Sequence, residues 1–398
     1  MKPSALFTAV LFSVSTSLAI PAVAEERIHR PQQVRPLPGQ LDNVLMLNDN
    51  NPELIKDEGI LLSTFPDAAQ GGLNVPLNGR FDLFSHHVYA GSETSLDSTL
   101  WIAVLAAPLG NERENLQLLE GSTALSQATQ TGQTAAPFLP LPALMRESTD
   151  VIAAGPGSRV AGDLLSKRRA KELSTDQWTL KPGEPTLLMA LPIPVQGLDP
   201  LLNGRNLQLR LHSSGPVTIA TVAAIASNDR PPATERLVKL LRSGKLSSKE
   251  HQPTPRGAKG KMIYSRVSGV QIGSNWRSQL SDPASQVLDV PLEPVSWPIS
   301  SLERGTLGTD QVQTAELEAF YPGTAWAAHG NYGVTYDLTL PLKNNQNDSI
   351  CIELALESPL KSDRRKDSLS FRTSRTGPVM FRGPIEVAGL DDQEGRPL

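Results

Sequence analysis

The chain has 398 residues, with 33 Pro and 30 Gly spread along its whole length. Both residues interrupt helices, so this composition excludes a coiled coil or a large helical bundle. A hydrophobic fraction of 39% is enough to build sizeable cores, which excludes wholesale disorder. The formal net charge of −4 is too close to zero to indicate a nucleic acid or another charged partner.

The first 24 residues have the pattern of a signal peptide. Lys2 supplies a positive charge, residues 5–20 are largely apolar, and Ala22-Val23-Ala24 gives a small-x-small cleavage pattern before Glu25. The apolar run is shorter than the roughly 20 residues that a membrane span needs, and no later run is longer. We therefore predict cleavage after Ala24, export to the periplasm or the extracellular space, and no transmembrane segment in the mature chain.

The next segments predict β structure. Residues 25–40 are polar and Pro-rich and are expected to form an extended lead-in, followed by a β domain over 41–226. Residues 207–211 alternate with period two, 213–216 interrupt the pattern, and 217–226 resume it, which predicts a hairpin. Further strands are expected at 100–105, 116–120, 178–180 and 186–190.

Two short helices are expected. The first runs from Ser158 to about Leu173, and the second has Thr234 as a candidate N-cap and Gly244 just beyond its end. The second helix begins a connector, residues 227–261, which we interpret as a helix plus a basic linker. Residues 229–261 contain nine Lys or Arg and three Asp or Glu, a net charge of +6. Without Lys2 the mature chain totals −5, so its other residues carry −11.

From residue 262 to 398 the β patterning returns, so we predict a mainly β protein with two β-sandwich-like domains. A possible internal repeat favours this division: strand, Pro-Leu-x-Asn turn and strand follow one another at 101–120 and again at 336–356. Two unrelated hairpins would also look alike. Cys351 is the only cysteine, which excludes an intramolecular disulfide, and its strand-like run 350–354 predicts a buried side chain.

The sequence lacks the familiar catalytic frameworks. There is no nucleophile elbow, zinc-protease motif, EF-hand loop or phosphate-binding loop. The adjacent pair His86 and His87, with His329, is the best set of metal ligands, but neighbouring side chains on a strand face opposite sides. We therefore expect no metal and no cofactor, with one histidine of the pair in the core and the other facing water.

Two functions remain open. Asp163, Asp337 and Glu353 lie in or beside structured runs, and a glycan or peptide hydrolase needs two carboxylates close in space. The preferred hypothesis is binding, because a basic segment on an otherwise acidic protein attracts anionic polymers such as an envelope polysaccharide. Nucleic acid is not expected, since aromatics are not interleaved with the basic residues. A solvated linker is the alternative interpretation. The candidate binding residues are Lys245, Lys249, Lys259 and Lys261.

Several runs resemble those of one family, namely 38–43, 58–66, 80–87, 154–160, 191–195, 304–309 and 321–336. Together they are similar to exported cyanobacterial proteins that carry a domain of unknown function. The resemblance implies secretion and a largely β architecture, and it brings no catalytic residues. Similar proteins continue beyond Pro384 with further strands, whereas here a polar turn at 391–395 is followed by the last residue, Leu398. Either this chain is shortened or its last strand remains an edge.

Overall fold

A computed structural model describes residues 27–66, 71–127, 129–130, 133–134, 156–263, 265–291, 293–364, 367–373 and 383–389. The predicted signal peptide and its cleavage site lie outside these residues, and so does the polar turn at 391–395. Among the residues described, no helix is both long enough and apolar enough to span a membrane.

The described residues form a mainly β, sandwich-like fold with open sheets, as the sequence predicts, and two α-helices. The helices are α1 (Pro156–Leu165) and α2 (Thr234–Arg242), with a short 3-10 turn at Glu93–Ser95. The strands before α2 are β1 (Arg27–Pro31), β2 (Gln33–Val34), β3 (Leu45–Leu54), β4 (Gly59–Ser63), β5 (Leu77–Ala90), β6 (Ser98–Pro108), β7 (Glu114–Leu125), β8 (Thr129–Gln130), β9 (Gln133–Thr134), β10 (Gln177–Leu180), β11 (Thr186–Ile193) and β12 (Leu202–Ser227). The later strands are β13 (Val267–Ile272), β14 (Asn275–Gln279), β15 (Leu288–Asp289), β16 (Val295–Ser296), β17 (Leu317–Phe320), β18 (Thr335–Thr339), β19 (Leu342–Lys343) and β20 (Ser368–Arg372).

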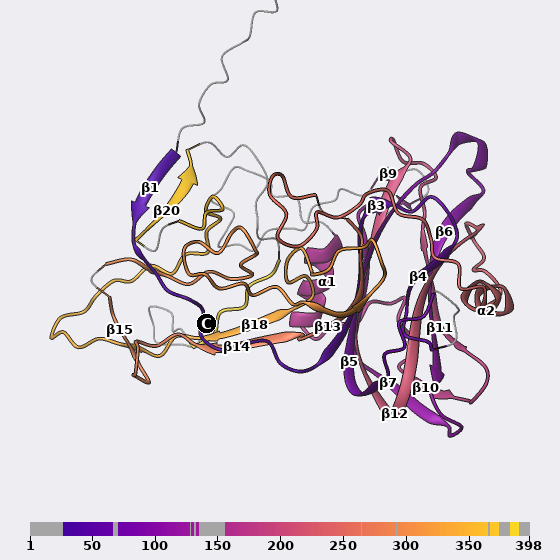
Figure 1. Cartoon of the computed structure of the whole chain (residues 1–398), viewed down its shortest axis with the longest axis horizontal. Helices are drawn as coiled ribbons and strands as arrows, with labels where there is room; N and C mark the ends of the chain where they lie inside the picture. Colours follow the sequence, from indigo (N-terminus) through magenta and orange to yellow (C-terminus); the bar gives the residue numbers. More distant parts are fainter. Residues whose placement is uncertain are drawn as a thin grey trace, which may run out of the picture.

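A ten-stranded main sheet occupies the right half of Figure 1. Its path runs β10-β7-β12-β5-β3-β13-β17, and β4, β6 and β11 branch from it. The branch arises because β12 is 26 residues long: its first half pairs with β5 and β7, and its second half with β6 and β4. The sheet thus forms two layers that share one strand.

The predicted hairpin over 207–226 is wrong, because both runs belong to the single strand β12. The register of β12 against β5 shifts between Ser213 and Val217, where β12 leaves β7 and joins β6. Gly215 and Pro216 lie inside this irregularity. A proline has no N–H for the sheet ladder, so within a strand it is tolerated at such a bulge as well as in a turn.

The core lies between the two layers. Leu207, Leu209 and Leu211 alternate along the first half of β12, and they join one buried cluster with Val104 of β6 and Leu47 of β3. Each such side chain contributes about 1.5–3 kcal/mol when it is removed from water. Because the alternation places the intervening polar residues on the opposite face, that face is available for polar contacts.

Helix α2 covers the outer face of the second layer, where Leu237 and Leu241 pack on Ile60 of β4. It ends as predicted, since Gly244 has a φ of 67°, a left-handed conformation that glycine adopts without strain. Its N-cap is Ala233, which is extended, and not the predicted Thr234.

Helix α1 is shorter than the sequence predicts. It begins two residues before Ser158, at Pro156, whose fixed φ suits the first helical turn. It ends at Leu165 and not near Leu173. Lys167 then adopts a φ of 55°, which a continuing right-handed helix does not allow. The basic run that follows is therefore outside the helix.

The second half of the chain is built onto the first. Strands β13 and β17 continue the main sheet, because β13 pairs with both β3 and β17. The main sheet is therefore not divided at the connector 227–261. The lead-in is extended, and its strands pair with the second half: β1 with β20 and β2 with β16. Figure 1 shows this loop-rich part on the left, with the parallel pair β14-β18 leading toward the main sheet.

The prediction for Cys351 is wrong: its side chain is exposed, and residues 350–354 form no strand. The run alternates as a strand does, but no neighbouring strand among the described residues pairs with it, and Ile352 and Leu354 are 50% and 67% exposed. The proposed repeat is not borne out either. Its second copy lacks a strand after the turn, while in the first copy β6 and β7 pair with other strands and not with each other.

Candidate functional site

The start of the basic connector is fixed to the body of the protein. Ile60 N of β4 donates a hydrogen bond to Lys245 O, and Ser247 N donates to Ile60 O, both at 2.9 Å. The buried Arg266 donates from its guanidinium to the carbonyl oxygens of Ser247 and Ser248, at 2.9 and 2.5 Å. Residues 245–248 are therefore held between β4 and the segment that leads into β13.

Glu53 at the end of β3 fixes the next part of the connector. Its buried carboxylate accepts hydrogen bonds from Glu250 N at 2.6 Å and from His251 N at 3.1 Å. Within the described ranges, Glu53, Glu250 and His251 form the one group of three potential metal ligands, with ligand atoms within 4.8 Å of one another. Lys56 already pairs with Glu250 at 2.6 Å. The group therefore serves to anchor the chain.

The structure separates the four predicted binding lysines into two kinds. Lys245 lies 3.5 Å from the carboxylate of Asp57, and Lys249 is half-buried beside Gly323. Neither presents a free, fully exposed charge. The other two lie on the loop 255–261, where no ion pair involves them among the described residues, and both are exposed: Lys259 and Lys261.

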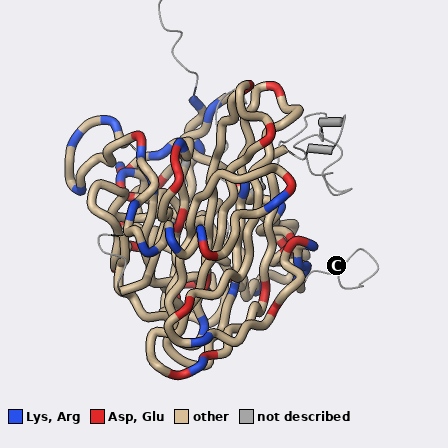
Figure 2. The backbone as a smooth tube through the Cα atoms, turned by 90° about the vertical axis from the view of Figure 1, so that its right-hand side faces the viewer, with Lys and Arg blue, Asp and Glu red and all other residues tan. Residues whose placement is uncertain are grey.

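Acidic residues offset much of the remaining connector charge. Arg236 of α2 pairs with Glu58, and Arg256 of the loop pairs with Glu316. Figure 2 shows basic and acidic residues on the side of the molecule that carries α2. An anionic polymer would therefore contact the loop 255–261 and not the whole connector.

A pocket of about 210 Å³ opens beside this loop, and we call it the Trp326 pocket. One wall comes from the end of the connector and the two residues after it, Pro253 to Ile263, and the other comes from residues 302–329. Ile263 and Val312 are 49% and 50% exposed, so apolar side chains reach solvent there. The polar and charged residues lining the pocket are Thr254, Arg256, Glu303, Thr314, Glu316 and His329.

Trp326 lies at the centre of this arrangement. The guanidinium carbon of Arg256 lies 5.0 Å from the centre of a Trp326 ring, and the indole Nε1 donates to Thr254 O at 3.4 Å. A guanidinium over an aromatic face is attracted by the negative charge of the π system. Trp326 thus contacts the connector at two residues, Thr254 and Arg256, and links the two walls of the pocket.

The backbone segment that carries Trp326 begins with strand β17. The backbone runs out along β17, turns at Tyr321, and returns so that Ala325 N donates to Arg266 O at 2.8 Å. Glu316 and Ala327 form an antiparallel bridge across this turn. Side chains alternate between the two sides of this returning segment, and Trp326 is on the side that faces the connector, where it contacts Thr254. The pocket therefore depends on the pairing of β17 with β13.

The three predicted histidines do not form a metal site among the described residues. His87 is fully buried, and its Nε2 lies 2.9 Å from Asp49 Oδ2. The neighbouring His86 is half-buried. Burial, with a smaller effect from His87, lowers the pKa of His86 to about 4, against a hydrogen bond with Asn206 that raises it. Hence the pair does divide between the two faces of β5, with His87 buried and His86 half-buried.

The third histidine lines the Trp326 pocket. Burial, helped by the positive charge of Lys361, lowers the pKa of His329 to about 4. His329 is therefore neutral at neutral pH, so it lines the pocket without adding a positive charge. Arg256 is the cationic side chain that lines the pocket.

The predicted carboxylates lie on separate elements. Asp163 of α1 accepts hydrogen bonds from Ser122 at 2.7 Å and from Arg168 at 3.1 Å. Asp337 of β18 pairs with an exposed Arg277, and Glu353 lies in the exposed run near Cys351. The carboxylates that do share a pocket are Glu303 and Glu316, which the sequence did not single out.

A second polar group lies inside the main sheet. Asp49 Oδ2 accepts a hydrogen bond of 2.6 Å from Thr221 Oγ1 in addition to its contact with His87, and all three side chains are buried. Nearby, the buried Tyr321 hydroxyl accepts a hydrogen bond from Ser63 N at 2.9 Å. Because these groups are closed off from solvent, they support the fold and do not meet a ligand. Residues 48–53 are almost all asparagine, aspartate or glutamate, and this run was the sequence signal that could have indicated the buried polar group.

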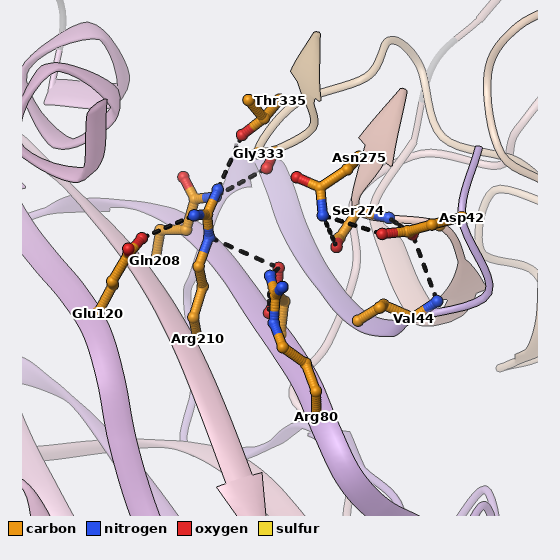
Figure 3. Close-up of polar contacts among 12 residues, drawn as sticks. Asp42, Val44, Arg80, Glu120, Gln208, Arg210, Ser274, Asn275, Gly333 and Thr335 are labelled. Carbon is orange, nitrogen blue, oxygen red and sulfur yellow. Dashed lines mark hydrogen bonds and ion pairs between the residues drawn. The ribbon is translucent and has the colours of Figure 1, made fainter. Parts of the chain in front are cut away.

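The outer face of the main sheet carries a polar seam against the second half of the chain (Figure 3). Arg210 of β12 donates to Glu120 at 2.6 Å and to Thr335 at 2.8 Å, and Gln208 donates to Gly333 O at 2.7 Å. These contacts join two strands of the main sheet to the start of β18.

Asp82 lies beneath this seam, and its side chain is 1% exposed. Burial raises the pKa of Asp82, opposed by the positive charges of Arg80 and Arg210. Arg80 donates to Asp82 at 3.2 Å. Each charge in the seam has a partner of opposite sign, so the seam holds the two halves together and offers no free group to a ligand.

A family model described as a protein of unknown function, DUF3370, matches residues 32–397, which is most of the chain. No curated protein and no solved structure matches the chain. The function therefore has to be inferred from the pocket and its surroundings.

Proposed function

We propose that this chain, which belongs to the DUF3370 family of proteins of unknown function, acts in the cell envelope by binding an anionic polysaccharide. Export is supported by the apolar run and small-x-small pattern of residues 1–24 and by the resemblance to exported cyanobacterial proteins. Binding is supported by the Trp326 pocket. We place the mature protein in the periplasm or outside the cell, where such polymers occur.

One observation carries the proposal. The exposed loop that bears Arg256, Lys259 and Lys261 contributes Arg256 to the lining of the pocket that contains Trp326. A polysaccharide needs both features, because its sugar rings have apolar faces that pack on aromatic side chains and its charged groups need cations. Ligand pockets generally combine an apolar lining with a few polar groups that set orientation. The proposal therefore narrows the four predicted lysines to two.

The test measures binding of purified protein to isolated envelope polysaccharide at low and at physiological salt. We expect wild-type protein to bind, and its affinity to fall as salt rises, because exposed charges are screened over about 8–10 Å at physiological ionic strength. The double variant Lys259→Gln, Lys261→Gln should bind more weakly and keep its fold, since both side chains are exposed.

A matched control changes the same charge elsewhere. The double variant Lys181→Gln, Lys343→Gln removes two exposed lysines that lie outside the loop 255–261. It should bind as wild type does. Equal loss in both double variants would show that only net charge matters, and wild-type protein that ignores the polymer at low salt would return the loop to a solvated linker.

A second candidate function is hydrolysis of an envelope glycan. It is favoured by Glu303 and Glu316, which line the same pocket, because glycosidases use two carboxylates on either side of the scissile bond. The assay is release of new reducing ends from the same polysaccharide. Release by wild type that is lost in Glu303→Gln would replace the binding proposal with hydrolysis.

A further inference from the structure

The Trp326 pocket already contains a carboxylate on its arginine. Glu316 pairs with Arg256, and both side chains are 63% exposed. Ion pairs as exposed as this one contribute only about 0–1 kcal/mol, because water screens them and two flexible side chains must be ordered. The pair is therefore easily exchanged for another carboxylate of comparable geometry.

Arg256 keeps its place when the partner changes. Its guanidinium lies over Trp326, 5.0 Å from the ring centre, and this attraction does not depend on Glu316. A planar guanidinium also presents a fork of donors that matches a carboxylate better than a single ammonium does. The pocket is thus lined by a fixed cation, Arg256, whose anionic partner, Glu316, can be displaced.

The size of the pocket limits what enters it. Pockets for drug-sized ligands span roughly 300–1,000 Å³, and this one has about 210 Å³. It suits one ring of a polymer, with the exposed Ile263 and Val312 beside the ring. Neighbouring sugar units of the polysaccharide would then lie along the exposed loop that carries Lys259 and Lys261.

We infer that the ring held in the Trp326 pocket is a sugar acid, and that Glu316 is its built-in competitor for Arg256. This inference rests on the proposed function. The ligand carboxylate replaces the Glu316 carboxylate on the guanidinium, and the freed Glu316 turns to solvent. The remaining charged residue that lines the pocket is Glu303, which repels the ligand.

If Glu316 competes with the ligand, removing this acidic side chain should tighten binding, because Arg256 is then free to bind the ligand carboxylate. With oligogalacturonate as the probe, Glu316→Gln should bind about two- to fivefold more tightly, the change that corresponds to a surface ion pair of up to about 1 kcal/mol. Glu303→Gln removes the same charge from the same pocket but frees no arginine, so its gain should be smaller. In an Arg256→Gln background, Glu316→Gln should gain no more than Glu303→Gln does, because no arginine is freed.

The outcomes separate this inference from the proposed function. If Trp326→Ala and Arg256→Gln leave polyuronate binding unchanged, the pocket is not the site and the proposed function fails there. If they weaken binding while Glu316→Gln brings no gain, the site stands and the competitor is wrong. An equal gain for dextran sulfate would overturn the carboxylate class, and an equal gain for neutral dextran would overturn both the charge and the class. Circular dichroism and thermal unfolding of Trp326→Ala confirm that the fold is intact, and Trp326→Phe replaces it if it is not.

Discussion

The imidazole of His87 and the carboxylate of Asp49 meet inside the main sheet, with Nε2 2.9 Å from Oδ2. The two residues lie on neighbouring parallel strands, β5 and β3, and Thr221 from the second half of β12 donates to the same oxygen at 2.6 Å. This hydrogen bond joins the two layers of the sheet. A buried acceptor that loses a partner keeps its desolvation penalty, so the contact is sensitive to deletion.

We predict that Thr221→Val lowers the free energy of unfolding by about 1–3 kcal/mol, because it keeps the shape and removes the donor. Thr221→Ser keeps the donor and loses one methyl group, so its effect should be smaller. Urea unfolding monitored by tryptophan fluorescence measures both. A valine variant as stable as wild type would show that the hydroxyl does not support the two layers.

Loss of Arg210 should destabilise the seam between the two halves of the chain. Its side chain is 18% exposed and contacts Glu120 and Thr335, so Arg210→Gln leaves partly buried acidic groups without their cation. We expect a loss of about 3 kcal/mol in the free energy of unfolding. Arg277→Gln is the control, since its pair with Asp337 is 87% and 57% exposed and should contribute at most about 1 kcal/mol. Similar losses in the two variants would contradict this assignment.

Stability should fall as pH falls from about 6.5 to 4. Burial lowers the pKa of His86 and of His329 to about 4, while an unfolded chain binds these protons near pH 6.5. The unfolded state therefore binds more protons in this window, and the stability present above pH 6.5 is lost on acidification. Each group accounts for up to about 3 kcal/mol.

The variant His86→Gln should flatten this decline, as measured by thermal unfolding across the pH window. His212 is exposed, so His212→Gln should retain the decline of wild type. If both variants lose stability with acid as wild type does, His86 is not a source of the pH dependence.

Trypsin should cut first in the loop 255–261, after Arg256, Lys259 or Lys261, since all three are exposed. The two fragments should then stay together in size-exclusion chromatography, because β13 of the second fragment pairs with β3 of the first and so continues the main sheet. Separation of folded fragments without denaturant would mean two independent domains, and first cuts within 100–220 would mean that another segment is the exposed one.

The mature protein should begin at Glu25. Intact-mass measurement of protein from the periplasm or the culture medium gives the starting residue directly. Retention of residues 1–24 on membrane-bound material would overturn both cleavage and export.

Much of the fold could be predicted from local patterns. Alternation located the strand around 207–211, a turn between apolar runs located those at 178–180 and 186–190, and the apolar residues before Gly244 located α2. These signals arise within short stretches of the sequence. The continuity of β12 could not be predicted, since Gly215-Pro216 is typical of a turn and of a bulge alike. Cys351 shows the converse: a strand-like pattern forms no strand when no neighbouring strand pairs with it.

The candidate site was predicted in part. The basic segment drew attention to Lys259 and Lys261, but local charge could not show that Asp57 engages Lys245. The pocket itself brings Thr254 and Trp326 together across 72 residues of sequence. That approach depends on β13 pairing with β17, a long-range contact that no short window of sequence contains.

The pairing of β1 with β20 has a consequence for how the chain folds. His29 Nδ1 lies 2.7 Å from Ser370 Oγ, across 341 residues of sequence, so this ribbon cannot close until nearly the whole polypeptide exists. Contacts between such distant residues carry a loop-closure entropy and slow the search for the native topology. During synthesis, residues 27–31 must wait without their partner strand. The pairing of the two ends of the chain is therefore the last step of folding. In folding intermediates that lack it, the amides of β1 should remain open to hydrogen exchange.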